Sequence, residues 1–173
     1  ADEQFLLVIR RLVPWLQDVR RPGRHLRILR NDAELLLVGE DPLIALQAMA
    51  PFITRVHAKD HVLLQSPDGP VVQGVPFGSG RLPLQEITRT LYEAGVRRFC
   101  YENVWSYTAP IKCAIDALPS TPCFTWDDPS RYLRGDTVQP VDAIAQEKIA
   151  FDLGLQAFWN VLEDCGYRIQ KKQ

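Results

Sequence analysis

Two short apolar runs in the middle of the chain set the pattern for the rest. The first covers residues 52–56 and is followed by His57, and the second covers residues 96–101 and is followed by Glu102. Between them lie a polar loop rich in Gly and Pro and a helix over residues 83–94, whose apolar positions recur at helical spacing. This order of strand, loop, helix and strand is that of a parallel α/β unit, in which ligands bind at the carboxyl ends of the strands.

The chain before this unit alternates between helices and strands as well. Residues 3–16 repeat apolar positions every three or four residues, which predicts a helix, and residues 25–29 form a weakly alternating candidate strand. Asp41-Pro42 predicts the start of a helix over residues 43–50, because Asp is a good N-cap and Pro is tolerated in the first turn. Strands separated by helices favour parallel pairing, so we expect an α/β fold.

The alternation stops after residue 107. Residues 108–142 are rich in Pro, Asp, Ser and Thr and predict an irregular extension. A terminal helix is expected within residues 143–169. We therefore predict one domain in three parts, with the α/β portion at 1–107 followed by the extension and the helix.

Composition excludes several classes of protein. The 173 residues carry 46% hydrophobic residues and a net charge of −1, which is typical of a soluble globular domain and gives no support to binding of nucleic acid or a membrane surface. No apolar run approaches the ~20 residues that span a bilayer, and with an acidic N-terminus we expect a cytoplasmic protein. The four cysteines form no CxxC pair, so we expect reduced thiols, with Cys100 packed in the core.

With these elements in place, the chain resembles the sugar phosphate isomerase/epimerase superfamily of xylose isomerase-like TIM barrels. The resemblance rests on Gly39-Glu40-Asp41-Pro42, on His57-Ala58-Lys59-Asp60, on Gly78-Ser79-Gly80 and on Glu102, in this order and spacing. It implies that residues 1–107 form the C-terminal portion of a (β/α)8 TIM barrel, with about three parallel βα units.

The resemblance also implies one divalent metal ion, which could be Mn, Co, Mg or Zn. Members of such families hold the metal with four side chains at the top of the barrel, and His57 and Glu102 correspond to the third and fourth. The second ligand of the family is an Asp, whereas this chain has Asn31 at the corresponding place and Asp32 one residue later. We take Asp32 as the candidate second ligand. The strand that carries the first ligand is missing from the sequence pattern.

Catalytic and substrate-binding residues follow from the same resemblance. Glu102 and Lys59 are the candidate catalytic residues, with Glu102 as acid or base. Asp60 and Trp105 are candidates for binding a small sugar or polyol, since aromatic faces stack on sugars. The remaining histidines, His25 and His61, are expected at the surface.

Three hypotheses remain open from the sequence. The chain is a metal-dependent sugar isomerase or epimerase, a dehydratase of a cyclic polyol on the same barrel, or an inactive barrel fragment that serves as a binding or structural subunit. The missing ligands suggest a truncated or divergent chain. An open barrel would expose unpaired sheet edges, so association with itself or with a fuller barrel through that edge is expected. An endonuclease is disfavoured because the chain lacks a basic track.

Overall fold

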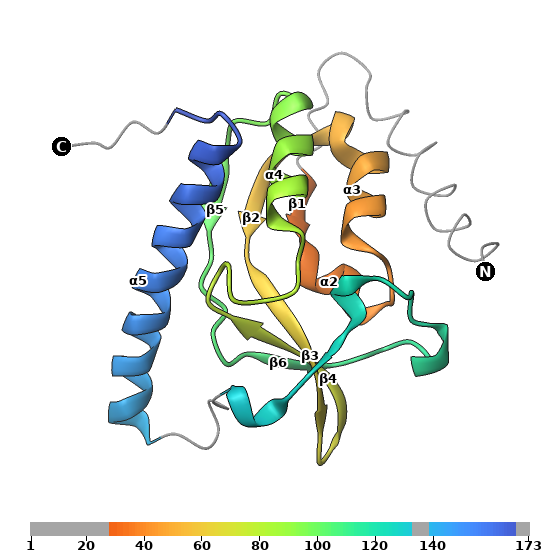
Figure 1. The fold of residues 1–173 in the computed structure, drawn as a ribbon, viewed down its shortest axis with the longest axis vertical. Helices are drawn as coiled ribbons and strands as arrows, with labels where there is room; N and C mark the ends of the chain where they lie inside the picture. Colours follow the sequence, from red (N-terminus) through yellow and green to blue (C-terminus); the bar gives the residue numbers. More distant parts are fainter. Residues whose placement is uncertain (1–27, 133–138, 169–173) are drawn as a thin grey trace.

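The computed structural model describes residues 28–132 and 139–168, and the side chains of residues 28–34 lie outside this description. The predicted helix at 3–16 and His25 also fall outside it. The described residues form a mixed α/β fold with two sheets (Figure 1). No helix among them is long and apolar enough to cross a bilayer.

The first sheet is parallel, as the sequence predicts. Its strands are β1 (Ile28–Asn31), β2 (Ile53–Ala58) and β5 (Phe99–Tyr101), in the order β1-β2-β5. The short helix α2 (Asp32–Leu37) and then α3 (Pro42–Met49) connect β1 to β2. This arrangement confirms an α/β fold with parallel strands, while a portion of a closed barrel remains a prediction because the described parallel strands form an open sheet.

The helix α3 begins where the sequence predicts. The carboxylate of Asp41 accepts hydrogen bonds from the backbone N–H groups of Leu43 and Ile44, at 2.9 and 3.1 Å, and Pro42 occupies the first turn. The helix α4 (Leu84–Glu93) has Ala94 as its C-cap, and Gly95 follows with a φ of 82°, a conformation that favours glycine.

The second sheet was not predicted. Its central strands β3 (Asp60–Ser66) and β4 (Gly69–Val75) form an antiparallel hairpin within the segment expected to be a loop. The turn signal at residues 66–70 is correct and closes this hairpin, but the apolar residues on either side of it belong to strands. The prediction of a loop was wrong because the turn residues masked the two β-branched runs beside them.

The segment 108–142 also differs from the irregular extension expected. It adds β6 (Thr108–Pro110) and β7 (Trp126–Asp127) to the hairpin, in the order β6-β4-β3-β7. Between and after them lie short 3-10 helices at Ile115–Ala117, Pro122–Phe124 and Pro129–Arg131. The terminal helix is confirmed as α5 (Pro140–Asp164).

Helices cover one face of the parallel sheet. Val56 packs in a core with residues of α2, α3 and α4, and Ala58 packs with Phe158 and Leu162 of α5. Phe99 and Tyr101 of β5 turn toward α5 as well, where both rings contact Phe158. Because side chains alternate along a strand, the residues between these point to the opposite face.

Candidate active site

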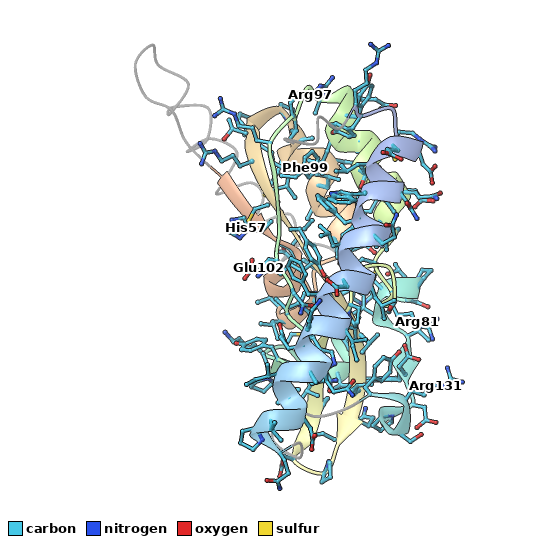
Figure 2. The ribbon with its side chains drawn as sticks, turned by 90° about the vertical axis from the view of Figure 1, so that its left-hand side faces the viewer. His57, Arg81, Arg97, Phe99, Glu102 and Arg131 are labelled. Carbon is cyan, nitrogen blue, oxygen red and sulfur yellow. The ribbon has the colours of Figure 1, made fainter. Side chains whose placement is uncertain are left out.

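His57, Lys59 and Glu102 meet at the carboxyl ends of two neighbouring parallel strands. His57 is the last residue but one of β2, and Glu102 follows β5 directly. The pairing of His57 with Cys100 and the hydrogen bond from the Glu102 N–H to the Ala58 carbonyl, at 3.1 Å, fix the relative position of the two ends. Figure 2 shows His57 and Glu102 on the side of the sheet away from α5.

One oxygen of Glu102 contacts both neighbours. Oε2 lies 2.8 Å from His57 Nδ1 and 2.9 Å from Lys59 Nζ. Since an ionised carboxylate only accepts hydrogen bonds, the proton of this pair belongs on Nδ1 of His57. The Lys59 side chain is 8% exposed, whereas those of His57 and Glu102 are 37% and 40% exposed, so an incoming ligand can reach the imidazole and the carboxylate.

The cluster keeps Glu102 ionised. Burial raises the pKa of Glu102, but the hydrogen bonds from Lys59 and His57 outweigh burial and hold the pKa below its ordinary value. A carboxylate in this state can bind a cation or accept a proton. The sequence therefore predicted correctly that these three residues lie together, whereas their chemical roles remain predictions.

Residues beneath the cluster line a hollow on the open face of the sheet. The hollow has a volume of about 340 Å³ and is lined by Arg55, Val56, His57, Arg98, Phe99 and Cys100. Cys100 is exposed here, so its expected place in the core was wrong. It lies two residues before Glu102 on β5, and strand alternation gives both side chains the same face. A larger hollow of about 740 Å³ lies over the β3–β4 hairpin and includes none of the three clustered residues.

Asp60 has an internal role in place of the predicted contact with substrate. It is 1% exposed, and its carboxylate accepts hydrogen bonds from the backbone N–H groups of His61, Gly78, Gly80 and Leu82. Burial raises its pKa to about 6, while the four backbone donors oppose this shift. A Cβ at Gly80 would overlap the Asp60 carboxylate, so glycine is needed for this close approach. Asp60 therefore holds residues 78–82 against the hairpin.

His61 is a buried residue that sequence reasoning placed at the surface. Its side chain is 2% exposed, and its Nδ1 has no hydrogen-bond partner among the described residues. Burial, reinforced by the charge of Lys59, lowers its pKa to about 3, so the imidazole is neutral at neutral pH. Recognition of the hairpin would have corrected this prediction, since a position within a central strand is usually covered.

Trp105 lies in the loop after Glu102, apart from the hollow beside His57. It borders a separate hollow of about 360 Å³ together with Ser106 and residues of α5, namely Ala143, Ile144 and Glu147. The structure therefore does not place the predicted sugar-binding Trp105 and His57 around a common hollow.

The donors in the described residues fall short of a complete metal site. His57 and Glu102 supply one nitrogen and one carboxylate, and no group of three or more His, Cys, Asp or Glu suited to a metal occurs in the ranges described. Asp32 is the first residue of α2, next to Asn31, which pairs with His57 across β1 and β2. The backbone thus brings Asp32 to the correct edge of the sheet, but its side chain lies outside the description. A metal would need at least one ligand from that edge.

Comparison with known proteins gives limited matches. No protein-family model matches the chain. It is 31% identical over 90 residues to an uncharacterized protein, YihM, of Escherichia coli. The matched region is 49% of this chain and 28% of the relative. It is also similar to the crystal structure of a xylose isomerase domain protein from Planctomyces limnophilus, with a TM-score of 0.46 and 20% identity over 91% of this chain and 43% of the other. The chain thus spans less than half the length of both proteins.

Proposed function

We propose that this chain supplies part of the active site of a sugar isomerase or epimerase-like enzyme, in which Glu102 transfers a proton and His57 and Glu102 contribute to a divalent-metal site. The observation that supports this proposal is the contact of His57 and Lys59 with a single oxygen of Glu102, at the carboxyl ends of adjacent parallel strands. Such an edge is where parallel α/β folds assemble their active sites.

Each side chain has a defined task in this proposal. Glu102 is held as a carboxylate and accepts a proton from a C–H next to a carbonyl, or returns it. Lys59 places a positive charge against that carboxylate, and this charge would stabilise an oxyanion on a substrate bound beside Glu102. Glu102 orients the His57 ring through Nδ1, which leaves Nε2 as the nitrogen for a metal. Glu102 would release Nδ1 before its own carboxylate could bind the same ion. A divalent cation would polarise the carbonyl and hydroxyl of a sugar or polyol. A dehydratase would use the same groups, so both reaction types remain within the proposal.

A second candidate is a binding or structural subunit without metal. It is favoured by the ion pair between Lys59 and Glu102, because the ammonium group occupies the oxygen that a metal would use. It is also consistent with the small number of metal donors in the part of the chain that the structure describes.

Titration with Mn²⁺ distinguishes the two candidates. We expect stoichiometric binding to the wild type, measured by calorimetry and by elemental analysis after dialysis, and its loss in His57→Ala. Cys100→Ser is the matched control, because Cys100 lies on the neighbouring strand and shares the open face, while thiols are poor ligands for Mn²⁺. If the wild type binds no Mn²⁺, the metal-dependent enzyme is refuted for this chain and the binding subunit is favoured.

Activity is tested separately by solvent exchange. A proton-transfer enzyme should incorporate deuterium from D₂O into the carbon next to the carbonyl of a bound ketose, which NMR detects without knowledge of the product. We expect Glu102→Gln to abolish this exchange and Cys100→Ser to retain it. Exchange that persists in Glu102→Gln would contradict the role assigned to Glu102.

A further inference from the structure

Two arginines lie side by side beneath the His57–Glu102 cluster. Arg55 is on β2, and Arg98 precedes β5 directly. Val56 pairs with Phe99, so the two arginines occupy the preceding positions on neighbouring strands, which run ~4.8 Å apart. The hydrogen bond from the Val56 N–H to the Arg98 carbonyl, at 3.1 Å, continues the sheet to this point.

Both arginines face the open side of the parallel sheet. Val56 and Phe99 turn toward the helices, and the alternation of side chains therefore directs Arg55 and Arg98 to the face that carries His57. Both arginine side chains are exposed, and both line the hollow of about 340 Å³ that reaches His57. The pair thus forms one wall of the hollow that the cluster borders.

The charges of this pair are not balanced by the described residues. Arg81 forms a two-point ion pair with Asp127, at 2.7 and 2.9 Å, and Arg97 lies 4.4 Å from the ring centre of Tyr92. Within the described ranges, Arg55 and Arg98 form no such contact. Like charges on neighbouring strands destabilise a sheet, and an anion between the two guanidinium groups would remove that repulsion.

We propose that Arg55 and Arg98 form an oxyanion site that binds a phosphoryl or carboxylate group. The planar guanidinium fork donates two parallel hydrogen bonds to such groups. Arg55 lies two residues before His57, a separation of ~6.6 Å along a strand. A sugar chain of several carbons can therefore place an anionic group at the arginines and its carbonyl end at the cluster. The assignment to an anionic sugar rests on the proposed function, whereas the oxyanion site itself does not.

Titration with inorganic phosphate tests the site directly. Phosphate binding is followed by calorimetry at low ionic strength, because screening weakens exposed charge pairs. We expect Arg55→Gln and Arg98→Gln each to weaken binding at least ~10-fold, as for loss of one charge-assisted contact, and Arg98→Lys to restore part of it. Arg89→Gln, an exposed arginine on α4, is the control and should bind like the wild type. No binding by the wild type, or equal weakening by all three Gln variants, would overturn the site.

Two further measurements separate this inference from the proposed function. Binding of a hexose phosphate and of a sugar acid is compared with binding of inorganic phosphate and of a neutral hexose. Tighter binding of an anionic sugar than of phosphate supports an organic ligand. Equal binding of the two supports a site for the free anion. In both cases we expect Arg55→Gln to bind the neutral hexose as tightly as the wild type does. Retained phosphate binding in a protein that binds no Mn²⁺ would uphold the oxyanion site and refute the metal site.

Discussion

The three clustered side chains depend on one another at a single carboxylate oxygen. Glu102 is held ionised by Lys59 and His57, and its exposure leaves the carboxylate accessible. The sequence was sufficient to predict this grouping, since residues that follow parallel strands meet at one edge. The same reasoning failed for Asp60 and His61, because their burial depends on a hairpin that was read as a loop.

Removal of Lys59 should raise the pKa of Glu102. Lys59→Met deletes the ammonium group at 2.9 Å from Oε2, so the carboxylate loses its main charge-assisted hydrogen bond. The change is measured by following the Glu102 carboxyl carbon by NMR as a function of pH. Lys112→Met removes an exposed charge elsewhere and serves as control. A pKa of Glu102 that is the same in both variants would show that Lys59 does not hold the carboxylate.

His61 should make the protein less stable in mild acid. Its pKa of about 3 in the folded state lies below the ordinary value of 6.5, so the unfolded chain takes up a proton first as the pH falls through 6.5. The free energy of unfolding is therefore expected to drop by about 2 kcal/mol through this residue between pH 7 and pH 5. Urea unfolding at the two pH values measures the drop, and His61→Leu should lack this part of it. An equal drop in the variant would contradict a buried neutral imidazole.

At the level of the elements, the loop after Glu102 depends on its attachment to β4. The Gly74 N–H donates to the Tyr107 carbonyl at 2.7 Å, and the Ser106 N–H donates to the Gly74 carbonyl at 3.0 Å. A Cβ at Gly74 would overlap the carbonyl oxygen of Val104. Gly74 lies in β4, so the hairpin directly supports the loop that begins at Glu102.

Gly74→Ala should displace this loop. The added methyl group has no space beside the Val104 carbonyl, and we expect a loss of about 1–3 kcal/mol in the free energy of unfolding. The NMR signals of His57 should shift in the folded variant because Glu102 moves. Gln65→Ala, at an exposed position of β3, is the control and should change neither quantity appreciably. Wild-type stability and unshifted His57 signals in Gly74→Ala would refute the support assigned to this glycine.

The elements were predictable to the extent that their signals are local. The Asp41-Pro42 start of α3, the end of α4 before Gly95 and the parallel order of β2 and β5 follow from capping residues and helix-separated apolar runs. The edge strands β6 and β7 of the second sheet were missed because they are only 3 and 2 residues long, whereas β3 and β4 were missed because the turn residues between them masked their apolar runs. Strands of this length form through pairing with neighbours that are distant in sequence, so no local sequence pattern predicts them.

At the level of the whole molecule, the parallel sheet has two unlike faces. Helices and aromatic residues cover one face, and the other presents His57, Arg55, Arg98 and Cys100 around a hollow. Parallel sheets are ordinarily covered on both faces. A polar, charged face of this kind is suited to a ligand. A small-molecule site on it remains a prediction, and association through the open sheet remains the alternative prediction.

The reactivity of Cys100 should distinguish a face that binds a small ligand from a face that is covered by another copy of the chain. Cys100 is exposed in the hollow, whereas burial raises the pKa of Cys113 and of Cys165, and raises that of Cys123 to about 11. Because the thiolate is the reactive form, iodoacetamide should modify Cys100 first, and phosphate in the hollow should slow this reaction. Mass spectrometry of peptides after short exposure locates the label, with Cys100→Ser as control. Protection of Cys100 that disappears on dilution of the protein would instead show that a second copy covers this face, and protection that persists at all concentrations would place another part of the chain over it.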